Sequence, residues 1–192
     1  MRKPDQFKYI RNREYYRKRL NFVLQHINLE DLRVLDLGCG ECLFSECSEF
    51  KKIKSYTAVD ELEYNTRIPY IRENVVDFLK TDKASYDLIL CLGLVDHLED
   101  SSYRELLTEI SKRSSSGWVI SMASSQNPII GLFHSAERTV LMPNYMRKPE
   151  LEIKLLKIPF SSKIMDLSHW PGFLSTETLW IRYPKMIQPH RN

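Results

Sequence analysis

Two glycines and two aspartates in the first third of the chain have the spacing of a nucleotide-binding turn. Asp36 lies in a short apolar run that breaks at Gly38 and Gly40. This pattern predicts a buried parallel strand that ends in a tight turn, where backbone comes close to a ligand. Asp60 ends the next apolar run, twenty positions after Gly40. A carboxylate at that spacing reaches the ribose hydroxyls of a nucleotide.

A candidate proton acceptor, His97, follows a later apolar run. Residues 88–92 are continuously apolar, which is typical of a central parallel strand covered on both faces. Asp96 and His97 therefore fall at the carboxyl edge of the expected sheet, where open sheets bind ligands. An imidazole there can take a proton from a substrate hydroxyl. The competing interpretation is a helix-entry residue that is hydrogen-bonded to neighbouring backbone.

Alternating apolar runs and amphipathic segments predict that an α/β fold positions these residues. One or two helices are expected over residues 4–27, a short helix within 43–50, and a helix from Asp100 or Ser101 to Arg113. The expected strands are residues 33–37, 56–60, 71–76, 86–92, 118–122, 162–167 and 177–183.

The glycine turn and the two acids resemble the motifs of the class I S-adenosylmethionine (SAM) dependent methyltransferases. The first motif of that family is an acid, an apolar residue and Gly-x-Gly-x-Gly, and a ribose-binding acid ends its second strand. Cys42 stands where the family has its third glycine. The run from Tyr86 to His97 is similar to the fourth motif of the family. The resemblance implies a doubly wound, mostly parallel seven-stranded sheet with an antiparallel C-terminal strand and helices on both faces.

The resemblance also implies a cofactor, SAM, and the residues that hold it. Asp77 matches the acid that contacts the adenine amino group, and a helix N-cap at Asp77 is an equally good interpretation. A helix ahead of the first strand often covers the cofactor in this family, so Tyr16 is a candidate contact of the methionine end. The implied cofactor residues are Tyr16, Asp36, Gly38, Cys39, Gly40, Asp60, Glu61, Asp77, Phe78, Cys91 and Leu92.

Length and charge limit the remaining possibilities. The 192 residues are expected to form a single domain, with an N-terminal helical cap over 1–28 and an insertion over 125–147 that serves as a substrate lid. The chain has 28 Lys and Arg against 25 Asp and Glu, but the first twenty residues are basic. That start fits either an RNA partner or a solvated helix face. No apolar run approaches the ~20 residues that span a bilayer, so a cytoplasmic protein is expected.

Four cysteines raise the question of a metal site. Cys39 and Cys42 have the spacing of metal ligands, but no second Cys pair or His pair completes a tetrahedral set. Reduced thiols and no metal are therefore expected.

The expected reaction is methyl transfer from SAM to a small-molecule acceptor, on oxygen or nitrogen, with His97 as the candidate base. No Asn/Asp-Pro-Pro-Tyr/Phe signature occurs, which argues against amino groups of bases or glutamine as acceptors. One alternative is a catalytically silent domain that keeps the fold to bind a partner or RNA. Another is an NAD-dependent Rossmann oxidoreductase, although its fingerprint requires a glycine where Leu43 stands.

Overall fold

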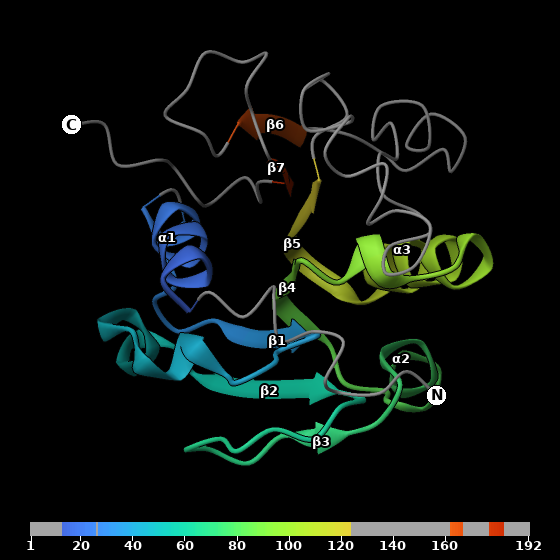
Figure 1. The fold of residues 1–192 in the computed structure, drawn as a ribbon, viewed down its shortest axis with the longest axis horizontal. Helices are drawn as coiled ribbons and strands as arrows, with labels where there is room; N and C mark the ends of the chain where they lie inside the picture. Colours follow the sequence, from blue (N-terminus) through green and yellow to red (C-terminus); the bar gives the residue numbers. More distant parts are fainter. Residues whose placement is uncertain (1–12, 26, 124–161, 167–176, 183–192) are drawn as a thin grey trace.

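A single seven-stranded sheet organises the molecule (Figure 1). The computed structural model describes residues 13–25, 27–123, 162–166 and 177–182. The strands are β1 (Arg33–Leu37), β2 (Ser55–Asp60), β3 (Ile71–Arg72), β4 (Tyr86–Leu92), β5 (Ser114–Ala123), β6 (Ser162–Asp166) and β7 (Glu177–Arg182). Their order is β3-β2-β1-β4-β5-β7-β6.

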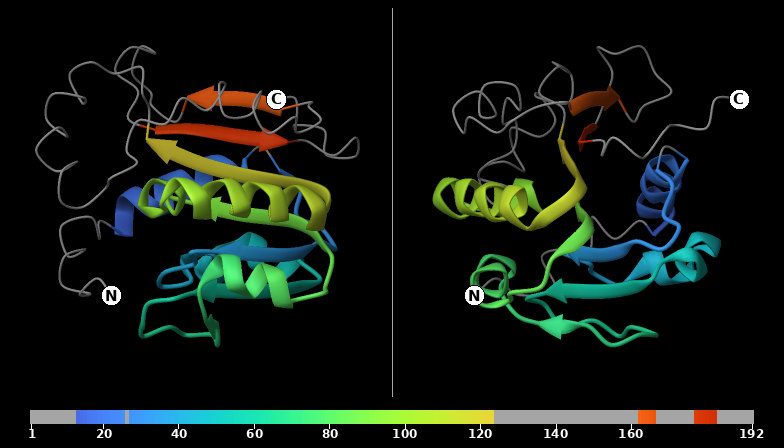
Figure 2. Two further views of the ribbon diagram at one scale, coloured as in Figure 1. Left: turned by 90° about the vertical axis from the view of Figure 1, so that its right-hand side faces the viewer. Right: turned by 180° about the vertical axis from the view of Figure 1, so that it is seen from behind.

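The first five strands pair in parallel, and β7 runs antiparallel to both β5 and β6 (Figure 2). The predicted α/β class with a mainly parallel sheet is confirmed. Since β1 lies between β2 and β4, the direction of winding reverses beside β1. Open sheets bind ligands at the carboxyl ends of the strands at such a reversal.

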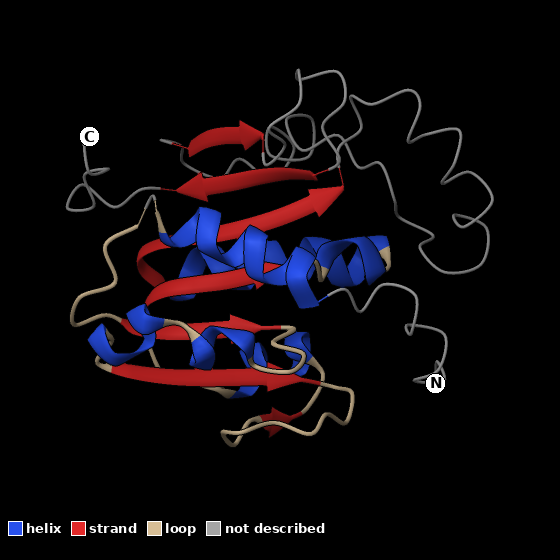
Figure 3. Ribbon diagram, turned by 60° about the vertical axis from the view of Figure 1, so that its left-hand side comes forward, coloured by secondary structure: helices blue, strands red, loops and turns tan. Residues whose placement is uncertain are grey.

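Helices cover both faces of the sheet (Figure 3). One face carries α1 (Arg13–Leu24) and two 3₁₀ turns, Leu43–Glu46 and Ser48–Lys52. The other carries α2 (Val75–Thr81) and α3 (Asp100–Arg113). Successive side chains of β1 alternate between two apolar cores, because strand side chains point to opposite faces. Val34 joins the α1 core, whereas Leu35 and Leu37 join the α2–α3 core.

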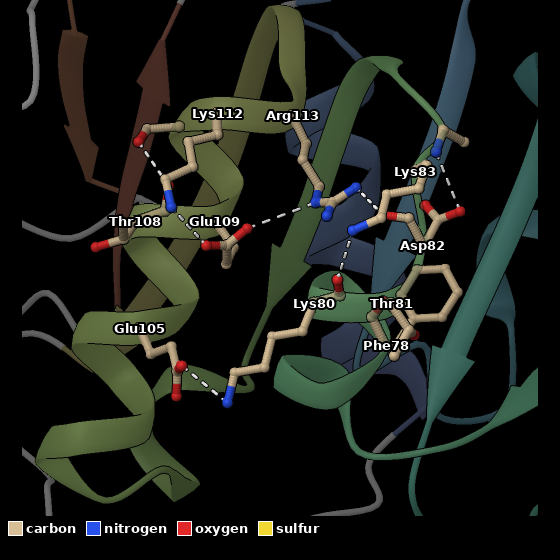
Figure 4. A network of polar contacts seen from close by, with 12 residues as sticks. Phe78, Lys80, Thr81, Asp82, Lys83, Glu105, Thr108, Glu109, Lys112 and Arg113 are labelled. Carbon is tan, nitrogen blue, oxygen red and sulfur yellow. Dashed lines mark hydrogen bonds and ion pairs between the residues drawn. The ribbon is translucent and has the colours of Figure 1, made fainter.

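Polar contacts join α2, α3 and the loop between α2 and β4 (Figure 4). Lys80 and Glu105 form an ion pair of 2.8 Å between the two helices. Arg113 donates to the carbonyl oxygen of Asp82 and lies 3.6 Å from Glu109. Helices that return between parallel strands end at the amino edge of the sheet, so Arg113 and Asp82 lie far from the carboxyl edge. The network therefore joins the two helices on this face of the sheet to each other and to the loop after α2.

The helix expected within residues 43–50 is wrong. Cys47 has extended backbone, with φ −82° and ψ 149°, and it ends one 3₁₀ turn and begins the next. This residue interrupts the helical hydrogen bonds, so no α-helix follows the glycine turn. A ligand at this turn would meet backbone amides and side chains but not the dipole of a long helix.

The strand expected over 71–76 is also too long, because α2 begins inside it. The side chain of Asn74 accepts from the backbone N–H groups of Val76 and Asp77, at 3.0 and 3.4 Å, and so caps the helix. The alternative role of Asp77 as the N-cap is therefore wrong. Asn74, three residues earlier, caps the helix instead, because its backbone has the extended conformation that an N-cap residue needs.

Other boundaries differ by a few residues. Helix α3 has Glu99 as its N-cap residue, so neither Asp100 nor Ser101 caps it. Strand β5 begins at Ser114 rather than at 118, because the serine segment pairs with the start of β4 across an irregularity in register. The 125–147 insertion and residues 1–12 of the N-terminal cap lie outside the described residues. No helix within the described ranges is long and apolar enough to cross a membrane.

Candidate cofactor site at the carboxyl edge

The glycine turn after β1 is fastened to the end of β2. The backbone N–H groups of Gly38 and Cys39 both donate to the carbonyl oxygen of Val59, at 2.8 and 3.2 Å. Gly38 and Gly40 have φ of +71° and +53°, a region that side chains rarely adopt. A Cβ at Gly38 would lie 3.0 Å from Leu94, whereas a Cβ at Gly40 would meet nothing within 4 Å. The backbone at Gly40 therefore faces open space.

Asp60 closes this turn from the end of β2. Its carboxylate accepts from the N–H of Gly40 and the N–H of Leu62, each at 2.9 Å. Burial raises the pKa of Asp60, and these two backbone donors oppose the rise. The next residue, Glu61, is exposed and accepts from the amide of Asn74 at 3.3 Å. The end of β2 and the start of α2 thus lie together.

Asp36 has the partner that a buried acid requires. The hydroxyl of Tyr56 donates to its Oδ2 at 2.6 Å. Burial raises the pKa of Asp36 to about 6, and the Tyr56 hydrogen bond and the charge of Arg19 oppose that rise. The negative charge of Asp60 acts in the same direction as burial. Asp36 is thus a carboxylate that can change its charge near neutral pH.

Arg19 is the residue that sequence reasoning missed. It lies on α1 and is only 6% exposed. Its Nη2 donates to the carbonyl oxygen of Leu92 at 3.2 Å, and its Nη1 donates to the hydroxyl of Ser121 at 3.3 Å. The guanidinium carbon lies 4.6 Å from the centre of the Tyr16 ring. A cation from α1 therefore reaches the carboxyl ends of β4 and β5.

Gly93 makes room for this guanidinium. A Cβ at Gly93 would lie 2.6 Å from Nη1 of Arg19, so a side chain at this position would require the guanidinium to shift, and the φ of +75° also favours glycine. The spacing of Tyr16, Leu20 and Val23 marks the inward face of α1, and Arg19 falls on that face because it is three residues after Tyr16. That spacing is the signal for a buried Arg19, and the many other basic residues in the first twenty positions obscure it.

The other predicted site residues occupy different surroundings. The carbonyl oxygen of Leu92 accepts a hydrogen bond from Arg19, and the ring of the half-buried Tyr16 packs against the Arg19 guanidinium. The side chain of Cys91 is instead fully buried in the α2–α3 core. Phe78 is buried in the same core. The side chain of Asp77 is 66% exposed and lies 4.0 Å from Lys80. Their contacts with a cofactor remain predictions.

His97 ends a 3₁₀ turn, Val95–His97, directly after β4. Its backbone N–H donates to the carbonyl oxygen of Leu94 at 3.0 Å, and its side chain is half-buried. Val95 and Leu98, on either side, pack into the α2–α3 core and fix the turn. The structure therefore places His97 on the same edge of the sheet as the glycine turn.

Open space at Gly40, two acids and a buried guanidinium thus lie near the switch point of a Rossmann-like sheet. A model of the family described as "Methyltransferase domain" matches residues 8–175. The chain belongs to this methyltransferase family and has the class I, Rossmann-like fold of SAM-dependent enzymes. The prediction of SAM as the cofactor is confirmed at this level.

Curated relatives and solved structures agree with this membership. The ubiquinone biosynthesis O-methyltransferase of Rickettsia bellii is 30% identical over 111 residues, which are 50% of this chain and 45% of that protein. The chain thus spans less than half the length of the curated relatives it matches.

Two solved structures share the fold over most of the chain. A SAM-dependent methyltransferase from Archaeoglobus fulgidus has a TM-score of 0.70 and 19% identity, covering 93% of this chain and 97% of that one. The N-methyltransferase NodS from Bradyrhizobium japonicum, in complex with S-adenosylhomocysteine (SAH), has a TM-score of 0.63 and 14% identity, covering 90% and 87%. At these identities the likeness concerns the fold alone.

Proposed function

We propose that this chain binds SAM at the carboxyl ends of β1, β2 and β4 and transfers its methyl group to a hydroxyl of a small molecule. The observation that carries the proposal is the convergence of Gly40, Asp60 and Arg19 at one edge of the sheet. When bound, SAM supplies an electrophilic methyl group on its sulfonium. The residues of this chain have to hold it, orient the acceptor and exclude water.

The chemistry of these side chains fits each part of the cofactor. Asp60 would accept hydrogen bonds from the ribose hydroxyls, because each carboxylate oxygen can accept a second hydrogen bond beside the one from the backbone. The backbone near Gly40 has the space that a ligand in van der Waals contact needs. Arg19 would bind the carboxylate of the methionine part, and Asp36 would attract its ammonium. The positive Arg19 would thus face the negative carboxylate of the ligand, and the negative Asp36 would face its positive ammonium.

His97 would take the proton of the acceptor hydroxyl. Its position after β4 is on the ligand edge, and an imidazole nitrogen can accept a proton from a hydroxyl within hydrogen-bond reach. The names of the curated relatives support oxygen as the acceptor atom, since they are O-methyltransferases. Arg17 pairs with Glu46 and Arg19 is buried, so two charges of the basic start already have other partners. A small molecule is therefore favoured over RNA.

Replacing His97 by alanine is expected to lower kcat about a hundredfold, the usual contribution of a positioned proton acceptor. SAH affinity should stay within about twofold, because the imidazole would touch the acceptor rather than the cofactor. Steady-state kinetics and calorimetry on the same preparations measure both values. Unchanged turnover would make His97 a structural residue at the helix entry.

SAH affinity is expected to rise as the pH increases from about 5 to about 7.5. Burial gives Asp36 a pKa of about 6, so its attraction for the ligand ammonium appears only as the pH passes that value. The rise approaches tenfold per pH unit below the pKa and levels off above it. Calorimetry across this range should show a smaller rise in Asp36→Asn. An identical rise in both proteins would assign the effect to another group.

The acceptor is tested by incubating the protein with methyl-deuterated SAM and matched panels of small phenols and small amines. The expected result is a phenol that carries the labelled methyl group as an ether, with an equal amount of SAH. Transfer only to amines would overturn the choice of oxygen. Cofactor binding without transfer to any member, together with RNA binding that weakens with salt, would favour the silent binding domain.

A further inference from the structure

Two thiols of the glycine turn lie in contact with each other. The Sγ atoms of Cys39 and Cys42 are 3.5 Å apart, with Cys42 as donor. The backbone N–H of Cys42 donates to the carbonyl oxygen of Cys39 at 2.9 Å, which makes residues 39–42 a closed turn. Such a turn keeps the first and last Cα atoms within about 7 Å, near the range of a disulfide.

Cys42 has a backbone conformation that its side chain disfavours. Its φ is 54° and its ψ is 43°, in the left-handed region. A residue with a Cβ loses about 1–2 kcal/mol there, whereas glycine adopts it freely. Cys42 also stands at the third glycine position of the methyltransferase motif. The side chain is fully buried, and the left-handed backbone is compatible with its contact to Cys39.

We propose that Cys39 and Cys42 are a redox site that closes to a disulfide across the cofactor turn. The oxidant is a small disulfide such as oxidised glutathione. The thiolate of Cys39, the half-buried member, attacks one glutathione sulfur and releases one glutathione thiolate. The sulfur of Cys42 then attacks the sulfur of Cys39 and releases the second. Each cysteine loses one proton, and two electrons pass to the oxidant.

The surroundings of Cys39 and Cys42 determine how fast the disulfide forms. The hydrogen-bonded contact between Cys39 and Cys42 and burial both raise the pKa of Cys39, so thiolate is scarce at neutral pH and closure accelerates as the pH rises. Within the described part of the chain, no group of three or more His, Cys, Asp or Glu side chains is placed to hold a metal. The pair is therefore assigned to thiol chemistry.

Formation of the disulfide would directly change the geometry of the cofactor turn. The two sulfurs must approach from 3.5 Å to about 2.05 Å, which pulls on the residues between them. One of these is Gly40, whose N–H binds Asp60. We expect the disulfide form to bind SAH about tenfold more weakly. This consequence rests on the proposed function, but formation of the bond does not.

Formation is tested by equilibrating the folded protein in glutathione buffers of increasing oxidised fraction, then alkylating free thiols. A protease that cleaves after glutamate cuts at Glu41 and Glu46 and separates the three cysteines of this segment. The expected product joins the Cys39 and Cys42 peptides, while Cys47 is alkylated. The matched control Cys47→Ser should form the same bond. Alkylation of both Cys39 and Cys42 at every ratio, or a bond to Cys47, would overturn the proposal.

Coupling is tested by titrating SAH into reduced protein, oxidised protein and Cys42→Gly. Glycine removes the thiol and suits φ 54°, so this variant should remain folded and bind SAH equally in both buffers. The wild-type protein should bind about tenfold more weakly when oxidised and recover with a reducing thiol. Equal affinity in both wild-type forms would overturn the coupling. If neither form binds SAH, the proposed function fails, and the peptide analysis alone decides the redox site.

Discussion

Arg19→Ala is expected to lower the affinity for SAH about a hundredfold, or about 2.8 kcal/mol at about 1.4 kcal/mol per tenfold. Arg19 is only 6% exposed, so the attraction of its guanidinium for a ligand carboxylate is little screened by water. The variant also removes the positive charge that lowers the pKa of Asp36. Calorimetric titration measures the loss, and Arg19→Lys should recover part of it.

Two controls separate ligand recognition from damage to the fold. Arg17→Ala changes a neighbouring arginine that is 54% exposed and pairs with Glu46, so SAH affinity should be unchanged. Methylthioadenosine lacks the carboxylate, so it should bind Arg19→Ala and the wild-type protein equally. An equal loss of affinity for methylthioadenosine would show that Arg19 stabilises the fold at the carboxyl edge and does not bind the ligand carboxylate.

Asp60→Ala is expected to weaken both SAH and methylthioadenosine by about tenfold to a hundredfold, since a hydrogen bond to a charged group contributes about 1.5–3 kcal/mol. Both ligands contain the ribose, so both should lose affinity, unlike the pattern for Arg19. The substitution also leaves the N–H groups of Gly40 and Leu62 without their acceptor. Thermal unfolding should therefore show a lower melting temperature.

Asp60→Asn keeps one carbonyl acceptor and should give an intermediate loss. Glu63→Ala is the matched control in the same loop, because Glu63 is 76% exposed and pairs only with Arg72 in the described contacts. Full SAH affinity in a folded Asp60→Ala protein would remove Asp60 from the ribose site.

Local patterns were enough to predict the acids and glycines of the site. Gly38, Gly40 and Asp60 are recognisable because each lies at the end of an apolar run, and the parallel sheet brings such ends together. Asp36 lies inside an apolar run, where a carboxylate needs a partner, but Tyr56 is twenty residues away and becomes its neighbour only through strand pairing. The sequence therefore predicted the need for a contact but not its donor.

Errors arose where packing or one backbone conformation decides the outcome. Arg19 contacts residues 73 and 102 positions away, and no local pattern links them. The segment after the glycine turn has helical composition, yet extended backbone at Cys47 divides it. At the start of α2, Asn74 and Asp77 are both good capping residues, and only the backbone of Asn74 is extended.

Calorimetric titration of the purified protein with SAH and with NAD, in parallel, is the most direct test of the site at the carboxyl edge. The glycine turn and Arg19, at the same edge of the sheet, predict that one SAH binds per chain and that NAD gives no heat of binding. Binding of NAD without SAH, or of neither, would contradict a methyl-donor site at this edge.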